Sequence, residues 1–145
     1  MRDFVYYAVL TPDDKEGGYV VTFTDFPEAI TQGEDIKNAL SHASDCLEEA
    51  VANRIVTGLS IPKPSPMEKG QYAVPLPAQM AAKAALYTTM KESGITKVEL
   101  ANRLNCDEKE VRRLLDPRHP SKLPRIESAL SVLGRRLVIK VQEAA

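Results

Sequence analysis

The chain is 145 residues long, which fits one average domain or two small ones, so the number of domains must come from its internal pattern. Hydrophobic residues make up 43% and charged residues 27%, a balance that supports a packed core and excludes disorder throughout. No apolar run approaches the roughly 20 residues of a membrane helix, and the first residues lack the apolar stretch of a secretory signal. We therefore expect a cytoplasmic protein that neither spans nor binds a membrane.

The net charge of −1 conceals two halves of opposite sign. Residues 1–70 hold 6 Lys and Arg against 12 Asp and Glu, which gives −6, whereas residues 71–145 hold 13 against 8, which gives +5. An acidic half suits a basic partner and a basic half suits a polyanion, although two solvated surfaces are the simpler explanation of charge taken alone. The two cysteines, Cys46 and Cys106, have no CxxC or histidine spacing around them, so we expect no metal site and no cofactor.

The first half begins with strand and turn signals. Residues 4–10 are apolar on both faces and rich in β-formers, and residues 19–23 follow the turn signal Gly17-Gly18, which together predict an antiparallel hairpin. Residues 29–32 add a short third strand before a glycine ends it.

A long helix and a proline-rich stretch follow. From an N-cap at Asp35, apolar residues recur every three or four positions as far as Ile55, which predicts an amphipathic helix that covers one face of the sheet. Three prolines at alternate positions favour an extended connector from about residue 58, so we place a first domain over 1–70 and a second over 71–145. Residues 71–76 either add an edge strand to the first domain or lead straight into the second.

The strongest functional signal lies in residues 95–115. Thr96 and Asp107 each stand three residues before a glutamate, and these two capping boxes predict two short helices around a tight turn. Asn105 stands at the turn, where this pattern usually has glycine and where asparagine is the next residue to accept a left-handed conformation. The pattern is typical of a helix-turn-helix, so we predict that the second half binds double-stranded DNA.

The second of these helices keeps a basic face outward once its apolar positions are buried. Arginine on such a helix can contact guanine or grip phosphate in the major groove. The residues expected to contact DNA from this helix and its flanks are Lys97, Glu108, Lys109, Arg112, Arg113, Arg118 and Lys122. Arg125 is expected to flank them as a further contact to phosphate. The alternative is a plain helical bundle with a basic face.

A closing helix over residues 121–134 and a terminal strand over residues 136–141 complete the prediction. A lone apolar strand is an exposed edge, so we expect it to pair across a two-fold axis or with the first domain. Specific DNA binding by so small a module also favours a homodimer or a higher even oligomer.

Residues 7–12, residues 17–33 and the helix that follows them resemble the HicB antitoxin family. The resemblance continues through Ile61-Pro62-Lys63-Pro64-Ser65 and Val74-Pro75-Leu76 to the helix-turn-helix that one branch of the family carries, whereas another branch ends in a ribbon-helix-helix. It implies an α+β chain with a partial RNase H-like βββα(β) first domain and an all-α helix-turn-helix second domain with a terminal strand. It also implies a HicA-type, mRNA-cleaving toxin as partner and repression of the operon that encodes both proteins.

The toxin-binding residues are expected on the rim after the second strand, at Asp25, Phe26, Glu28 and Gln32, because a turn built on proline presents charge and aromatic area rigidly. The alternative places Phe26 in the core. A nuclease needs carboxylates that converge on metal ions, and residues 4–10 contain no acid, so we expect a scaffold without enzymatic activity. A transcription regulator whose first domain senses a small molecule is the alternative function.

Overall fold

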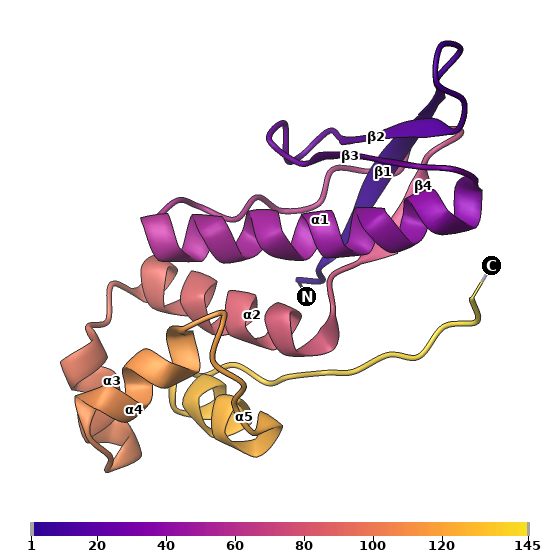
Figure 1. Cartoon of the computed structure of the whole chain (residues 1–145). Coiled ribbons are helices and arrows are strands. Elements are labelled where there is room, and N and C mark those ends of the chain that lie inside the picture. The colour runs from indigo at the N-terminus through magenta and orange to yellow at the C-terminus, as the bar shows by residue number, and fades with distance from the viewer. Residues whose placement is uncertain (1, 145) are drawn as a thin grey trace. The chain divides into compact units, whose positions relative to one another are not determined.

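The computed structural model describes residues 2–144, in which two units of the chain can be distinguished. The first unit extends to Ala81 and the second begins at Ala82 (Figure 1). This boundary lies further along the chain than residue 70, where the sequence suggested it. None of the helices in the described part of the chain is long and apolar enough to cross a membrane.

A four-stranded antiparallel sheet with the order β3-β2-β1-β4 forms the first unit. The strands are β1 (Val5–Pro12), β2 (Tyr19–Phe23), β3 (Ile30–Gly33) and β4 (Tyr72–Pro75). The predicted hairpin and short third strand are confirmed, and residues 71–76 take the edge-strand alternative. The α+β class of the prediction is also confirmed.

Helix α1 (Ile36–Thr57) covers one face of this sheet (Figure 1). It begins as predicted at Asp35, whose carboxylate accepts the N–H of Asn38 at 2.8 Å. The helix approaches β3 so closely that a Cβ at Gly33 would lie 2.4 Å from the backbone of Ala39. Glycine is therefore required at position 33 for the helix to pack on the sheet.

The proline-rich segment after α1 is extended, as predicted, but it is part of the first unit. Ile61 is buried, with 5% of its surface exposed. Three contacts from distant parts of the unit hold the segment: Arg2 Nη2 donates to the Ile61 carbonyl, Tyr6 Oη to that of Pro62, and the Ser65 N–H to Asp25. Nearby Arg54 Nη1 also donates to the Ser60 carbonyl. These residues therefore close the unit and do not act as a free linker.

Four helices make up the rest of the chain: α2 (Ala78–Ser93), α3 (Lys97–Leu104), α4 (Glu108–Leu115) and α5 (Leu123–Val132). Helix α2 starts just before the boundary, and the helices enclose a core in the second unit. The buried members of this core are Ala82, Leu86, Met90, Leu100, Ala101, Val111, Leu114, Ile126, Ala129 and Leu130. The two predicted helices within residues 95–115 and the predicted helix over residues 121–134 are thus confirmed, with slightly different ends.

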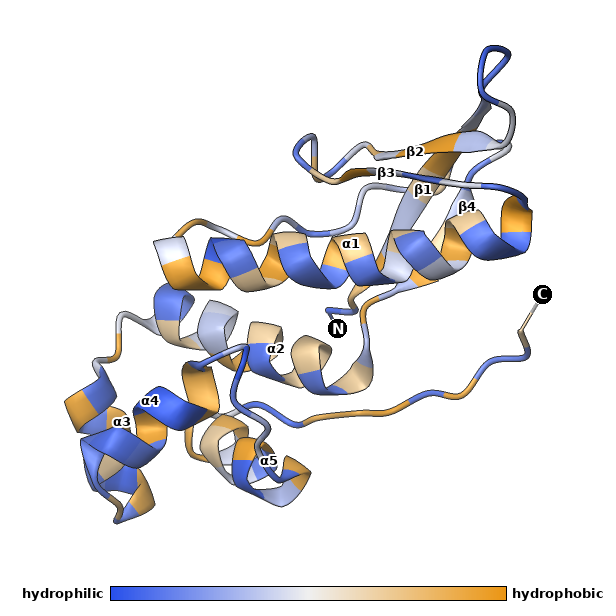
Figure 2. Ribbon diagram, in the orientation of Figure 1, coloured by the Kyte–Doolittle hydropathy of each residue, from blue (hydrophilic) through white to orange (hydrophobic). Residues whose placement is uncertain are grey.

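The predicted terminal strand over residues 136–141 is wrong for the single chain. Residues 135–144 have no regular secondary structure, and Figure 2 shows a hydrophobic stretch within this extended tail. Leu137 packs on the core of the second unit, while Ile139 and Val141 are 66% and 95% exposed. A strand needs a partner for its backbone hydrogen bonds, and no described residue of the chain supplies one.

Candidate nucleic-acid interface

Two short helices, α3 and α4, meet at a tight turn, and both begin at a side-chain cap. The Thr96 hydroxyl accepts the N–H of Glu99 at 3.1 Å, and the Asp107 carboxylate accepts the N–H of Glu110 at 3.0 Å. Asn105 ends α3 with φ 55°, the left-handed conformation expected from the sequence. The segment is therefore two helices and not one straight rod.

The sides on which α3 and α4 face each other are apolar. Leu100 and Ala101 of α3 and Val111 and Leu114 of α4 are all buried, at 4% exposure or less. The small side chain of Ala101 lets the two helices cross at short distance. This packing fixes which side of α4 remains in water.

The side of α4 that faces water is basic. Lys109, Arg112 and Arg113 are exposed, and the Arg112 side chain is 62% exposed even though it pairs with Glu108 at 2.9 Å. The side chains of Lys109 and Arg113 have no ion-pair partner among residues 2–144. Two cations and a third in an exposed, exchangeable pair are thus available to an external anion, while Glu108, also predicted as a contact, is held by Arg112.

The predicted flanking residues lie around this helix. Lys97 is the exposed first residue of α3, and Lys122 is the exposed residue before α5. Arg118 is exposed in the loop between α4 and α5, where its N–H donates to the Asp116 carboxylate. A shallow cleft in the same region is lined by Arg113, Lys122, Arg125 and His119 among others.

Two residues that line this cleft, Arg125 and His119, differ in whether the sequence predicts them. Arg125, a predicted flanking contact to phosphate, pairs through its guanidinium with Glu110 of α4, so it ties α5 to α4. His119 belongs to no motif in the sequence, and only its place in the loop next to Lys122 brings it to the cleft. Sequence reasoning had no periodic signal by which to find it.

Lys83 of α2 is a functional candidate that the sequence reading missed. Its side chain is completely buried, and its ammonium donates to the carbonyls of Arg113, Leu114 and Asp116 at 2.9, 3.2 and 2.8 Å. The Ser121 hydroxyl lies 2.9 Å from the same nitrogen and shares its three N–H donors with these carbonyls. The lysine therefore satisfies the last carbonyls of α4, where a positive charge also complements the helix dipole.

The environment of Lys83 has opposing effects on its charge. Burial lowers the pKa of the Lys83 ammonium below its usual value, and the Asp116 carboxylate acts against that shift. A signal for its role exists in the sequence, because Lys83 stands three and seven positions before the core residues Leu86 and Met90. A charged residue on an apolar stripe is a candidate for a buried, hydrogen-bonded role.

Phe26, predicted on the rim of the first unit, lies in its core. Its ring is fully buried and meets the Tyr6 ring edge-on at 4.9 Å between centroids. The guanidinium of Arg54 lies over the other side, 4.6 Å from the ring centroid. Phe26 therefore offers no aromatic surface to a partner, and the alternative that places it in the core describes the structure.

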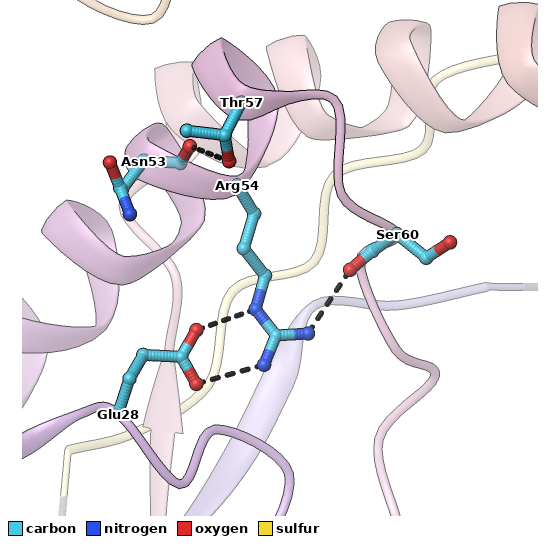
Figure 3. A network of polar contacts seen from close by, with 5 residues as sticks. All are labelled: Glu28, Asn53, Arg54, Thr57 and Ser60. Carbon is cyan, nitrogen blue, oxygen red and sulfur yellow. Dashed lines mark hydrogen bonds and ion pairs between the residues drawn. The ribbon is translucent and has the colours of Figure 1, made fainter.

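Glu28 is exposed but already engaged. Figure 3 shows its carboxylate in a two-pronged contact with Arg54, at 2.6 and 2.8 Å, while the same guanidinium donates to the Ser60 carbonyl. The hydrogen bonds from Arg54 lower the pKa of the Glu28 carboxyl, and those to Glu28 raise the pKa of Arg54. This pair fastens the turn after β2 to the end of α1.

The other two predicted rim residues differ in their surroundings. Asp25 is half-buried and accepts the N–H and hydroxyl of Ser65. Gln32 is exposed on the edge strand β3, and its carbonyl lies 2.7 Å from His42 Nδ1. The structure thus brings Asp25, Phe26 and Glu28 together around the proline-rich segment and leaves Gln32 apart from them.

Within residues 2–144, no three His, Cys, Asp or Glu side chains gather in a way that could hold a metal ion. Cys46 and Cys106 are free thiols, and burial raises the pKa of each. The features that stand out among the described residues are the exposed basic side of α4 in one unit and the four-stranded sheet in the other.

Comparison with known proteins agrees with this arrangement. The family model described as the HicB-like antitoxin of bacterial toxin-antitoxin systems matches residues 5–85. "Antitoxin HicB" of Pseudomonas fluorescens is 36% identical over 99% of this chain and 100% of its own length. "Antitoxin HicB" of Escherichia coli K12 is 36% identical over 91% and 95%, and "Antitoxin HicB 1" of Photorhabdus laumondii 35% over 94% and 86%. These matches span both units, and the chain belongs to the HicB-like antitoxin family.

Proposed function

We propose that the first unit neutralises a small mRNA-cleaving toxin of the HicA type in the cytoplasm, and that the second unit represses the operon encoding both proteins. Repression uses α3 and α4 as a helix-turn-helix on operator DNA, in a homodimer that places two copies of α4 on two half-sites. The first unit serves as a partial RNase H-like scaffold without catalysis. The observation that carries the DNA-binding half is the exposed basic face of α4.

The dimensions of α4 support its placement in a groove. An α-helix with its side chains is about 10–12 Å across, comparable to the roughly 12 Å width of the major groove of B-DNA. Lys109, Arg112 and Arg113 project from its exposed side, so arginine can contact bases while lysine neutralises phosphate. Lys97, Arg118 and Lys122 lie where they set the register through the DNA backbone.

Membership of an antitoxin family supports the toxin-binding half. The first unit carries 6 basic and 12 acidic residues, so its net charge of −6 attracts a basic RNA-binding protein and speeds their association. An acidic antitoxin surface also competes with the RNA that such a toxin binds. These two effects favour a protein partner over a small-molecule ligand for this unit.

Operator binding is tested by titrating labelled DNA from upstream of the gene with the full chain. We expect Arg112→Ala and Arg113→Ala each to weaken specific binding by roughly 1 to 3 kcal/mol if the lost contact is to a base. Lys91→Ala removes the same charge from the last turn of α2 and serves as the matched control, which should bind like wild type. A double variant at Arg112 and Arg113 that still binds operator like wild type refutes this use of α4.

Toxin binding is tested by co-expressing the chain with the small gene beside its own. We expect the two proteins to purify together and the operator-binding variants to retain the toxin, because their substitutions lie in the other unit. A neighbouring protein that never associates with the wild-type chain contradicts the proposal.

A further inference from the structure

The sheet of the first unit has one face without a helix. Strand register places Tyr6 and Ala8 of β1 on the side of α1, where both are fully buried. Successive side chains of a strand point to opposite faces, so Val5, Tyr7 and Val9 lie on the other side. Figure 1 shows α1 on one side of the sheet only.

This second side, called the open face below, is uncharged and largely apolar. Its residues follow from the strand pairing: Val5, Tyr7, Val9, Thr11, Val20, Thr22, Ile30, Gln32, Ala73 and Pro75. Val9 is 37% exposed and Ile30 61% exposed, whereas Tyr6, Ala8, Val21, Phe23 and Val74 on the α1 side are buried. An antiparallel sheet that faces water usually carries mainly polar residues on that side, whereas the polar residues here are three, Thr11, Thr22 and Gln32.

Carboxylates stand next to the ends of the strands that form the open face. Asp3 precedes β1, and Glu34 follows β3. The hairpin between β1 and β2 adds Asp13, Asp14 and Glu16, with Lys15 as its one cation. A central apolar area with a tyrosine, and a charged rim around it, is the composition of a protein-protein interface.

We propose that the open face is the surface on which the first unit binds its basic toxin partner, an inference that rests on the proposed antitoxin function. The carboxylates next to the strand ends favour a basic protein over a second copy of this unit as the partner. A second copy of this unit brings another −6 charge to the same contact and is repelled, whereas a basic protein is attracted. Gln32, predicted from the sequence as a toxin contact, lies on this face, while Asp25, Phe26 and Glu28 are engaged at the proline-rich segment.

The test is a double substitution on the open face in the full chain, Val9→Arg with Ile30→Arg. Both side chains are exposed, so the variant keeps its core, and two positive charges then oppose a basic partner. Val56→Arg is the matched control, because Val56 is a 64% exposed apolar residue near the end of α1 in the same unit. Calorimetric titration with the toxin encoded beside the chain should show at least tenfold weaker binding for the double variant and wild-type binding for Val56→Arg.

A milder double variant distinguishes a direct loss of toxin binding from a loss caused by misfolding. Val9→Thr with Ile30→Thr keeps β-branched side chains and should weaken toxin binding less, with wild-type melting temperature and wild-type operator affinity. Toxin binding by the arginine variant that equals wild type overturns the open face as the docking surface but leaves the antitoxin function standing. Loss of self-association in the arginine variant, measured by light scattering without toxin, assigns the face to a second copy and also overturns the proposal. Failure of the wild-type chain to bind the toxin refutes the antitoxin function itself.

Discussion

Among single residues, Lys83 ties α2 to the end of the candidate DNA-binding helix α4. We expect Lys83→Met to keep the aliphatic stem but to remove the ammonium that donates to three carbonyls at the end of α4, of which the Arg113 carbonyl keeps a contact with the Ser121 hydroxyl. Unsatisfied buried groups of this kind cost about 3 kcal/mol in total, so the second unit should unfold at lower urea concentration and operator affinity should fall with it.

The control for Lys83 is Lys91→Met, on the same helix but exposed. It should change the free energy of unfolding by less than about 0.5 kcal/mol. Equal stability of the two variants, measured by circular dichroism in urea, would show that the ammonium of Lys83 contributes nothing to α4.

Residue-level prediction succeeded where the cause is local. The caps at Thr96 and Asp107 and the left-handed Asn105 follow from interactions within four residues, and all three are confirmed. Lys83 was missed because its partners lie 30 to 38 residues away in the sequence. Phe26 was ambiguous for the same reason, since the ring and the guanidinium that cover it come from β1 and α1.

At the scale of elements, the proline-rich segment gives the first unit a pH dependence. Tyr6 is fully buried and donates its hydroxyl to the Pro62 carbonyl at 2.6 Å, and burial raises the pKa of Tyr6 to about 12. The unfolded chain loses this proton near pH 10, whereas the folded chain keeps it to about 12. The folded state binds more protons between these values, so its stability falls as the pH rises, by at most about 1.4 kcal/mol per pH unit.

Urea unfolding between pH 8 and 12 checks this effect. Tyr6→Phe removes the titrating group, so its stability should depend less on pH in that window, at a cost of about 1 kcal/mol at pH 8 for the lost hydrogen bond. Parallel curves for the variant and the wild type would mean that Tyr6 does not cause the alkaline loss.

We propose that the tail after α5 forms a strand only when it pairs with the tail of a second copy of the chain. Val138, Ile139 and Val141 are exposed and β-branched, and two such tails can form an antiparallel pair across a two-fold axis. We expect light scattering at micromolar concentration to give the mass of two chains for wild type. Ile139→Lys with Val141→Lys should give the mass of one chain, because its charges repel across the axis. A wild-type chain that stays monomeric contradicts the dimer, and a variant that stays dimeric places the contact elsewhere.

The sequence predicted helices and strands accurately where the hydrophobic pattern is periodic. It predicted them less well where a strand forms only by pairing with a distant segment. The hairpin and α1 follow from two- and four-residue patterns in the chain itself. Strand β4 was left open because two prolines limit it to an edge, and only its pairing with β1 decides the matter. The predicted terminal strand is absent from the single chain because no described residue offers it a strand to pair with, and its pairing across a two-fold axis stays a prediction.

At the scale of the whole molecule, the opposite charges of the two halves were visible in the sequence, but the boundary was not. Prolines marked residues 58–70 as extended, yet they belong to the first unit because Arg2, Tyr6 and Asp25 hold them from 40 to 59 positions away. Such contacts leave no periodic trace in the chain. The partial RNase H-like and helix-turn-helix assignments, and the residues proposed to contact DNA and toxin, remain predictions.

The central claim is that the two units perform separate tasks, with toxin binding in the first and operator binding in the second. Growth of cells that express the neighbouring toxin together with this chain measures it most directly. We predict that wild type and the Arg112→Ala, Arg113→Ala double variant restore growth equally, since the altered arginines lie outside the first unit. Growth arrest that persists with wild type, or that returns with the arginine variant at equal protein level, contradicts the account.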